Sequence, residues 1–144
     1  MAAVVLTERP VRLDSERLGA PFVSVGVIAV CADSDDEAER LAASSRMMLS
    51  LLRQGRLIEI PPVDKALRYL ETRERSSGGR RAVIGAPETV RAGIEQVASE
   101  YGAEEVLVLT ITHDHAARRR SYELIAGAFG LAADQPSSSV TTSR

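Results

Sequence analysis

The feature that most limits the fold of this chain is its alternation of apolar runs with helical patterns. Residues 22–32 form a nearly continuous, Val-rich apolar run, which is typical of a strand buried on both faces. Shorter apolar runs at 82–85 and 105–111 are each followed by a helical pattern. Strands that alternate with helices pair into parallel sheets, which need cover on both faces. Because so few strands cannot close a sheet, we predict an α/β fold that completes a larger structure.

The predicted helices carry clear start and stop signals. Ser34 and Glu37 have capping-box spacing within an acidic segment, an apolar stripe follows to about Arg53, and Gly55 ends the helix. The next helices have signals of the same kind, a proline at the first position, an N-cap aspartate and glycines at the ends: Pro87, Gly102, Asp114 and Gly130.

Residues 54–80 differ in character from the rest of the chain. Pro61-Pro62 interrupts the pattern, a short helix is predicted over 63–75, and 76–79 (SSGG) is a flexible stretch. A long, irregular connection in a compact α/β domain is typical of a lid or binding loop, and a surface excursion is the open alternative. The final segment, 132–144, is rich in Ser, Thr and Pro and is predicted to be disordered.

Composition excludes several classes of protein. A chain of 144 residues with 44% hydrophobic and 26% charged residues is typical of one globular domain. No apolar run approaches the roughly 20 residues that a membrane-spanning helix needs. The N-terminus is a poor signal peptide, and the single cysteine cannot form an internal disulfide. These features favour the cytoplasm. A net charge of −2, 3% aromatic residues and no Trp argue against a nucleic-acid surface.

The sequence His113-Asp114-His115 suggests a metal site, but the donor set is too small. Zinc or iron needs at least three ligands of suitable geometry, and the chain has no other histidine and no cysteine nearby in sequence. The simpler interpretation is a strand-to-helix turn in which Asp114 caps the following helix. We therefore predict no metal here.

Four segments, in order, resemble the C-terminal part of the bacterial luciferase-like flavin-dependent monooxygenases. They are 25–42 (VGVIAVCADSDDEAERLA), 83–91 (VIGAPETVR), 102–108 (GAEEVLV) and 112–126 (THDHAARRRSYELIA). The resemblance implies a partial (β/α)8 TIM barrel, a fold that typically takes about 250 residues. It also implies FMN or the deazaflavin F420 as cofactor, bound at the C-terminal ends of the strands, with oxygen activation or hydride transfer as the chemistry.

The same resemblance makes 22–32 and 105–111 the last two major strands and 54–80 the mobile active-site segment. The part of the family barrel that precedes these segments has no counterpart in this sequence, and in the family it holds much of the flavin phosphate site and the catalytic groups. We therefore assign no catalytic residue in this chain.

Three residues are candidates for flavin contacts. The loops that follow the strands build the active site of a (β/α)8 barrel, and Thr112 and His113 lie just past the end of 105–111. Thr110 and Thr112 share one face by strand alternation, so both could face the barrel mouth. Arg81 ends the lid-like segment and could reach a flavin phosphate. The alternative for the turn, which we favour, is simple capping and packing.

Two further features have simple interpretations. The N–H groups at the start of the helix at Pro87 could hold a phosphate, but Glu88 would repel an anion, so a tight turn is favoured. Cys31 ends a strand with no base beside it in sequence. We expect it to behave as a small apolar residue.

We therefore expect residues 1–131 to be the C-terminal portion of a luciferase-like monooxygenase barrel. Its flavin-dependent activity on a small-molecule substrate would require the missing barrel portion, supplied by a complementing subunit or by a second copy in a homo-oligomer. Two alternatives stay open: a non-catalytic homodimeric α/β module that has lost the flavin site, and a fragment without autonomous function. No nucleic-acid or membrane partner is expected.

Overall fold

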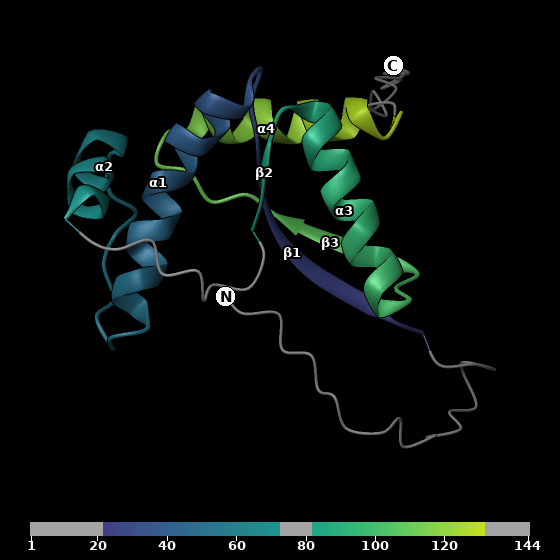
Figure 1. The fold of residues 1–144 in the computed structure, drawn as a ribbon, viewed down its shortest axis with the longest axis horizontal. Coiled ribbons are helices and arrows are strands. Elements are labelled where there is room, and N and C mark those ends of the chain that lie inside the picture. The colour runs from purple at the N-terminus through teal and green to yellow at the C-terminus, as the bar shows by residue number, and fades with distance from the viewer. Residues whose placement is uncertain (1–21, 73–81, 132–144) are drawn as a thin grey trace, which may run out of the picture.

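A computed structural model describes residues 22–72 and 82–131 (Figure 1). The elements follow the predicted order: β1 (Ser24–Cys31), α1 (Asp35–Leu52), α2 (Val63–Glu71), β2 (Ala82–Gly85), α3 (Pro87–Tyr101), β3 (Glu105–Leu109) and α4 (His115–Ala128). The predicted stretch at 76–79, Arg81 and the tail at 132–144 lie outside the described residues. In the part of the chain that the structure describes, every helix is too short or too polar to cross a bilayer.

The strands form a parallel sheet with the order β2-β1-β3, which confirms the prediction of an α/β fold with a parallel sheet. β1 pairs with β3 over its first half, from Ser24 to Ile28, and with β2 over its second half, from Ile28 to Cys31. β1 and β3 are therefore direct neighbours, while β2 lies on the other edge of β1.

One face of the sheet packs against α3 and α4. Alternate residues of β1 point to this face, as strand geometry requires, and meet apolar residues of both helices. The buried members of this core are Val25, Val27, Ala29, Cys31, Val83, Val90, Ile94, Val97 and Ile125. Three of them, Val90, Ile94 and Val97, form the buried face of α3.

A second apolar cluster joins α1 to α2, which lie together at one side of the molecule (Figure 1). Its buried members are Ala43, Met47 and Leu51 of α1 and Ala66 of α2. α1 also packs against β1 and β2, so it connects this cluster to the sheet. Met47 fills the core, as its flexible side chain suits it to do.

The run at 22–32, predicted to be buried on both faces, alternates between exposed and buried residues over the first half of β1, and the strand predicted within 105–111 is shorter and more exposed than its apolar run suggests. The strand ends at Leu109, and two of its leucines are exposed, Leu107 by 59% and Leu109 by 46%. Their neighbours in the sheet register are Gly26 and Ile28 of β1, so the four residues share one face. The apolar run predicts a strand suited to cover on both sides, but the described residues cover only one side of β3.

The helix ends confirm most of the predicted signals. Ser34 Oγ accepts a hydrogen bond from the Glu37 N–H at 3.3 Å, and Asp114 Oδ2 accepts one from the Ala117 N–H at 2.7 Å. Gly102 ends α3 in the left-handed conformation that favours glycine. Only α2 differs, since it ends at Glu71 rather than at 75.

Candidate functional site

The carboxyl ends of all three strands meet at one edge of the sheet, because the strands are parallel. β1 leads there into Ala32 and Asp33, β2 into Ala86, and β3 into the turn from Thr110 to Asp114. Open α/β sheets bind their ligands outside the carboxyl ends of the strands, and (β/α)8 barrels do the same. This edge is therefore the candidate site.

Hydroxyl groups replace the missing strand pairing at this edge. β3 ends opposite Ile28, while β1 continues to Cys31, which leaves backbone groups of β1 without a ladder partner. Thr110 Oγ1 donates to the carbonyl of Ala29 at 2.8 Å, and Ser121 Oγ of α4 accepts from the N–H of Cys31 at 2.8 Å. The two hydroxyl oxygens lie 3.4 Å apart, so one polar pair satisfies the end of the strand.

Thr110 and Thr112 are both buried, with 3% and 4% of their surface exposed. The hydroxyl of Thr112 donates to the carbonyl of Asp114 at 2.9 Å, and that of Thr110 is held by Ala29. Both hydroxyl protons are therefore bound to backbone oxygens. These residues fix the turn after β3, in agreement with the capping and packing interpretation.

His113 is exposed and holds the segment before α2 against this edge. Its Nδ1 lies 2.9 Å from the carbonyl oxygen of Ile60, 53 residues earlier in the chain. The described part of the lid-like segment therefore reaches the carboxyl end of β3. Nearby, His115 Nδ1 lies 2.8 Å from a guanidinium nitrogen of Arg118. No group of three metal-ligating side chains lies close together within residues 22–72 and 82–131.

An acidic side chain occupies the start of α3, the helix terminus whose N–H groups could hold a phosphate. Asp35 Oδ1 accepts a hydrogen bond from the Ala86 N–H at 2.7 Å. Gly85 permits this approach, because a Cβ at that position would lie 2.6 Å from the same oxygen. The carboxylate takes the place of an external anion, which supports the tight-turn interpretation.

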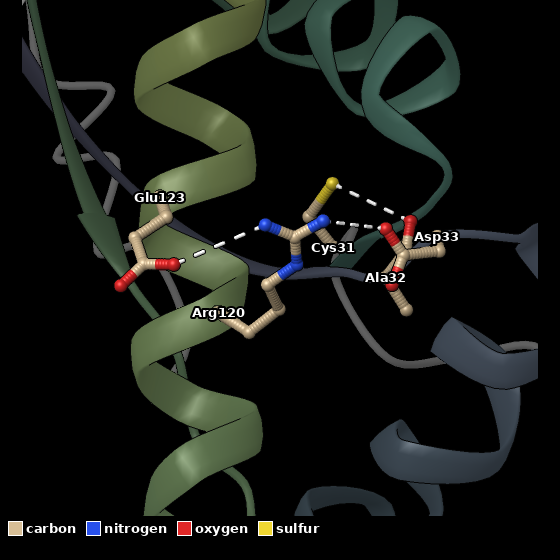
Figure 2. Close-up of polar contacts among 5 residues, drawn as sticks. All are labelled: Cys31, Ala32, Asp33, Arg120 and Glu123. Carbon is tan, nitrogen blue, oxygen red and sulfur yellow. Dashed lines mark hydrogen bonds and ion pairs between the residues drawn. The ribbon is translucent and has the colours of Figure 1, made fainter.

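Cys31 lies close to the ion pair between Arg120 and Asp33 (Figure 2). The Arg120 guanidinium lies 2.8 Å from Asp33 Oδ1 and 4.0 Å from Glu123 Oε2. The hydrogen bond to Asp33 raises the pKa of Arg120. Burial raises the pKa of the Cys31 thiol, and Asp33 adds to that shift while Arg120 opposes it. The thiol therefore keeps its proton near neutral pH and behaves as the predicted small apolar residue.

The sequence did not single out Ser121, Arg120 or Asp35 as residues of this edge. Ser121 stands four residues before Ile125, on the buried face of α4. A serine at a core position of an amphipathic helix is a signal that a buried backbone group needs a partner. The signal exists in the sequence, but the partner, Cys31, lies 90 residues away.

Curated relatives place the chain among known proteins, although no family model matches it. A luciferase-like monooxygenase of Escherichia coli (strain K12) is 30% identical over 114 residues, which are 76% of this chain and 34% of that protein. The uncharacterised protein YwcH of Bacillus subtilis (strain 168) is 32% identical, with the same coverage. The chain thus spans about a third of the length of the curated relatives that it matches.

Solved structures give the same placement. Apo-MsnO8 superposes with a TM-score of 0.70 and 32% identity, over 79% of this chain and 36% of that chain. The FMN complex of the oxygenating constituent of 3,6-diketocamphane monooxygenase from the CAM plasmid of Pseudomonas putida is 20% identical over 78% of this chain and 34% of that chain. Its TM-score is 0.47, so this similarity does not contribute to the family assignment. Together, the identity to the relatives and the similarity to MsnO8 show that this chain is a partial member of the luciferase-like monooxygenase family.

Proposed function

We propose that the chain forms the C-terminal part of a flavin-dependent luciferase-like monooxygenase barrel and that its activity requires the rest of that barrel. Membership of the family supports the class of reaction, because two relatives carry the name luciferase-like monooxygenase. The length of those relatives supports the need for further strands, because the chain spans about a third of it.

The observation that carries this proposal is the uncovered face of β3. Leu107 and Leu109 are exposed beside Gly26 and Ile28, on a strand whose other face packs against the core. In a closed barrel that face would look inward and meet side chains from other strands. Fully burying a leucine is worth about 1.5–3 kcal/mol, so cover from further strands would stabilise the sheet.

The flavin would bind at the carboxyl edge, as FMN or as the deazaflavin F420, beside a small-molecule substrate. Within this proposal His113 and Thr112 border the cofactor from the turn after β3, and Arg81 reaches its phosphate. His113 supports this placement best, because it is exposed at the edge where parallel strands end. The groups that activate oxygen would come from the remaining part of the barrel, and the protein would work in the cytoplasm.

A second candidate function is a non-catalytic homodimeric module. The same exposed leucines favour it, because a second copy could cover them as well as further strands could. In that case the face of β3 would be buried between two copies, and the carboxyl edge would bind no flavin.

Complementation distinguishes the two. The chain is purified alone and together with the part of the Escherichia coli relative that it does not match, and FMN binding is followed by quenching of flavin fluorescence. We expect binding only in the mixture, with a 1:1 complex by sedimentation. A matched variant, Leu107→Lys, should prevent the complex. A homodimer that does not associate with the added segment and binds no FMN would favour the non-catalytic homodimeric module.

A further inference from the structure

The backbone on both sides of His113 is fixed. The hydroxyl of the buried residue Thr112 donates to the carbonyl of Asp114 at 2.9 Å, and the Asp114 carboxylate accepts from the Ala117 N–H at 2.7 Å. The residue before His113 is thus locked in the core, and the residue after it caps α4. The His113 ring is therefore attached to a rigid backbone at the end of a strand, as the side chains of binding sites usually are.

The ring itself is held by one nitrogen, and the identity of its partner determines the tautomer. Nδ1 lies 2.9 Å from the carbonyl oxygen of Ile60, which can only accept a hydrogen bond. Nδ1 must therefore carry the proton. In the neutral ring Nε2 then has the free lone pair, and among the described residues it has no hydrogen-bond partner.

His115 shows the opposite arrangement two residues later. Its Nδ1 lies 2.8 Å from a guanidinium nitrogen of Arg118, which can only donate. Nδ1 of His115 must therefore accept, and the proton of the neutral ring lies on Nε2. The only two histidines of the chain thus have opposite tautomers, each set by a different neighbour.

We propose that His113 is a hydrogen-bond acceptor, through Nε2, for an N–H or O–H group of the ligand bound at the carboxyl edge of the sheet. The position of the ligand rests on the proposed function, whereas the tautomer rests on the Ile60 contact alone. The anchored ring would orient such a ligand and is able to take a proton from it. His115 cannot do the same in its neutral form, because its lone pair is bound to Arg118.

The tautomers can be measured on the chain without any ligand. Long-range proton–nitrogen NMR spectra of the 15N-labelled chain identify the protonated nitrogen of each neutral ring, and His113→Gln and His115→Gln give the assignment. We expect the proton on Nδ1 of His113 and on Nε2 of His115. A His113 ring protonated on Nε2 would overturn the proposal, whether or not the chain binds flavin.

A chemical probe tests the free lone pair. Diethyl pyrocarbonate acylates a neutral imidazole nitrogen that has an available lone pair, and peptide mapping shows which histidine reacts. We expect His113 to react severalfold faster than His115 in the native chain, and both to react at similar rates in the unfolded chain. Equal rates in the native chain would contradict an available acceptor on His113.

A final arm tests the role toward a ligand, with FMN as the probe in the complemented barrel. His113→Leu should weaken FMN binding more than His113→Gln, because glutamine keeps an acceptor oxygen, and His115→Gln should leave the affinity within about twofold. FMN binding that is unchanged in His113→Leu would overturn the acceptor role while the proposed function stands. Failure of the unsubstituted complemented barrel to bind FMN would refute both the proposed function and the ligand role, and would leave only the tautomer.

Discussion

Ser121 of α4 accepts a hydrogen bond from the backbone N–H of Cys31, the last residue of β1, over 2.8 Å. The two residues are 90 positions apart, and both are almost completely buried. This contact attaches the last helix to the central strand at the edge where a ligand would bind.

Replacement of Ser121 by alanine should destabilise the fold. Ser121→Ala leaves the Cys31 N–H buried without a partner, which costs about 1–3 kcal/mol in the free energy of unfolding. Ser45→Ala is a matched control, because Ser45 is also buried but its hydroxyl bonds to Ala42 of its own helix. Urea unfolding of both variants tests the prediction. A Ser121→Ala variant as stable as Ser45→Ala would contradict it.

Ser44 should behave in the opposite way. It is fully buried in α1, and its hydroxyl has no hydrogen-bond partner among the described residues. Removing an unpaired buried hydroxyl relieves a desolvation cost, and alanine is the better helix former. We therefore expect Ser44→Ala to raise the free energy of unfolding by about 1 kcal/mol. A loss of stability in the same urea experiment would contradict this prediction and indicate that the Ser44 hydroxyl has a hydrogen-bond partner in solution.

The elements of this fold could be predicted because their signals are local. The Ser34 and Asp114 caps, the proline at the start of α3 and the apolar stripe of α1 all act within a few residues. The strand order and the exposure of Leu107 could not be predicted in the same way. They depend on which strands pair and on what covers each face, and an apolar run does not encode either.

The places of Thr112 and His113 in the fold could be predicted from the sequence, but the contacts at this edge could not. The sequence placed Thr112 and His113 at the end of a strand, and the structure finds both at the carboxyl edge. The contacts of His113 with Ile60 and of Asp35 with Ala86 join segments more than 50 residues apart. Such pairs arise only once the parallel sheet brings the strand ends together, so single-sequence patterns do not contain them.

The Cys31 thiol should make the stability of the chain fall at alkaline pH. Burial, with a smaller contribution from Asp33, raises the pKa of this thiol above its ordinary value. The folded chain therefore holds the proton more tightly than the unfolded chain does. The resulting stability is fully present below the unfolded pKa, about 8.5, and is lost as pH rises toward the folded pKa.

Urea unfolding between about pH 7.5 and about pH 9.5 measures this effect. The quantity to compare is the difference in the slope of stability against pH between the native chain and Cys31→Ala, because that difference isolates the contribution of the thiol. The variant should be less stable at neutral pH, because it leaves a small cavity, but its stability should fall less as pH rises. Parallel curves for the two chains would refute a buried, protonated thiol.

The two faces of β3 should respond differently to polar substitutions. Leu107 and Leu109 are exposed, whereas Val106 and Val108, which alternate with them, pack partly against the core. A Leu107→Thr/Leu109→Thr double variant should change the free energy of unfolding by no more than about 0.5 kcal/mol for each substitution, as surface changes usually do. A Val106→Thr/Val108→Thr double variant on the opposite face should cost about 1–3 kcal/mol, because it buries hydroxyl groups.

Self-association provides the second measurement. Exposed leucines on an edge strand favour contacts between copies, so the double variant at Leu107 and Leu109 should sediment as a smaller species than the native chain at the same concentration. The control variant at Val106 and Val108 should keep the native association behaviour below its unfolding transition. If the leucine variant lost as much stability as the valine variant at a concentration where all the chains are monomeric, these leucines would be covered within the single chain, and the uncovered face that supports the barrel proposal would not exist.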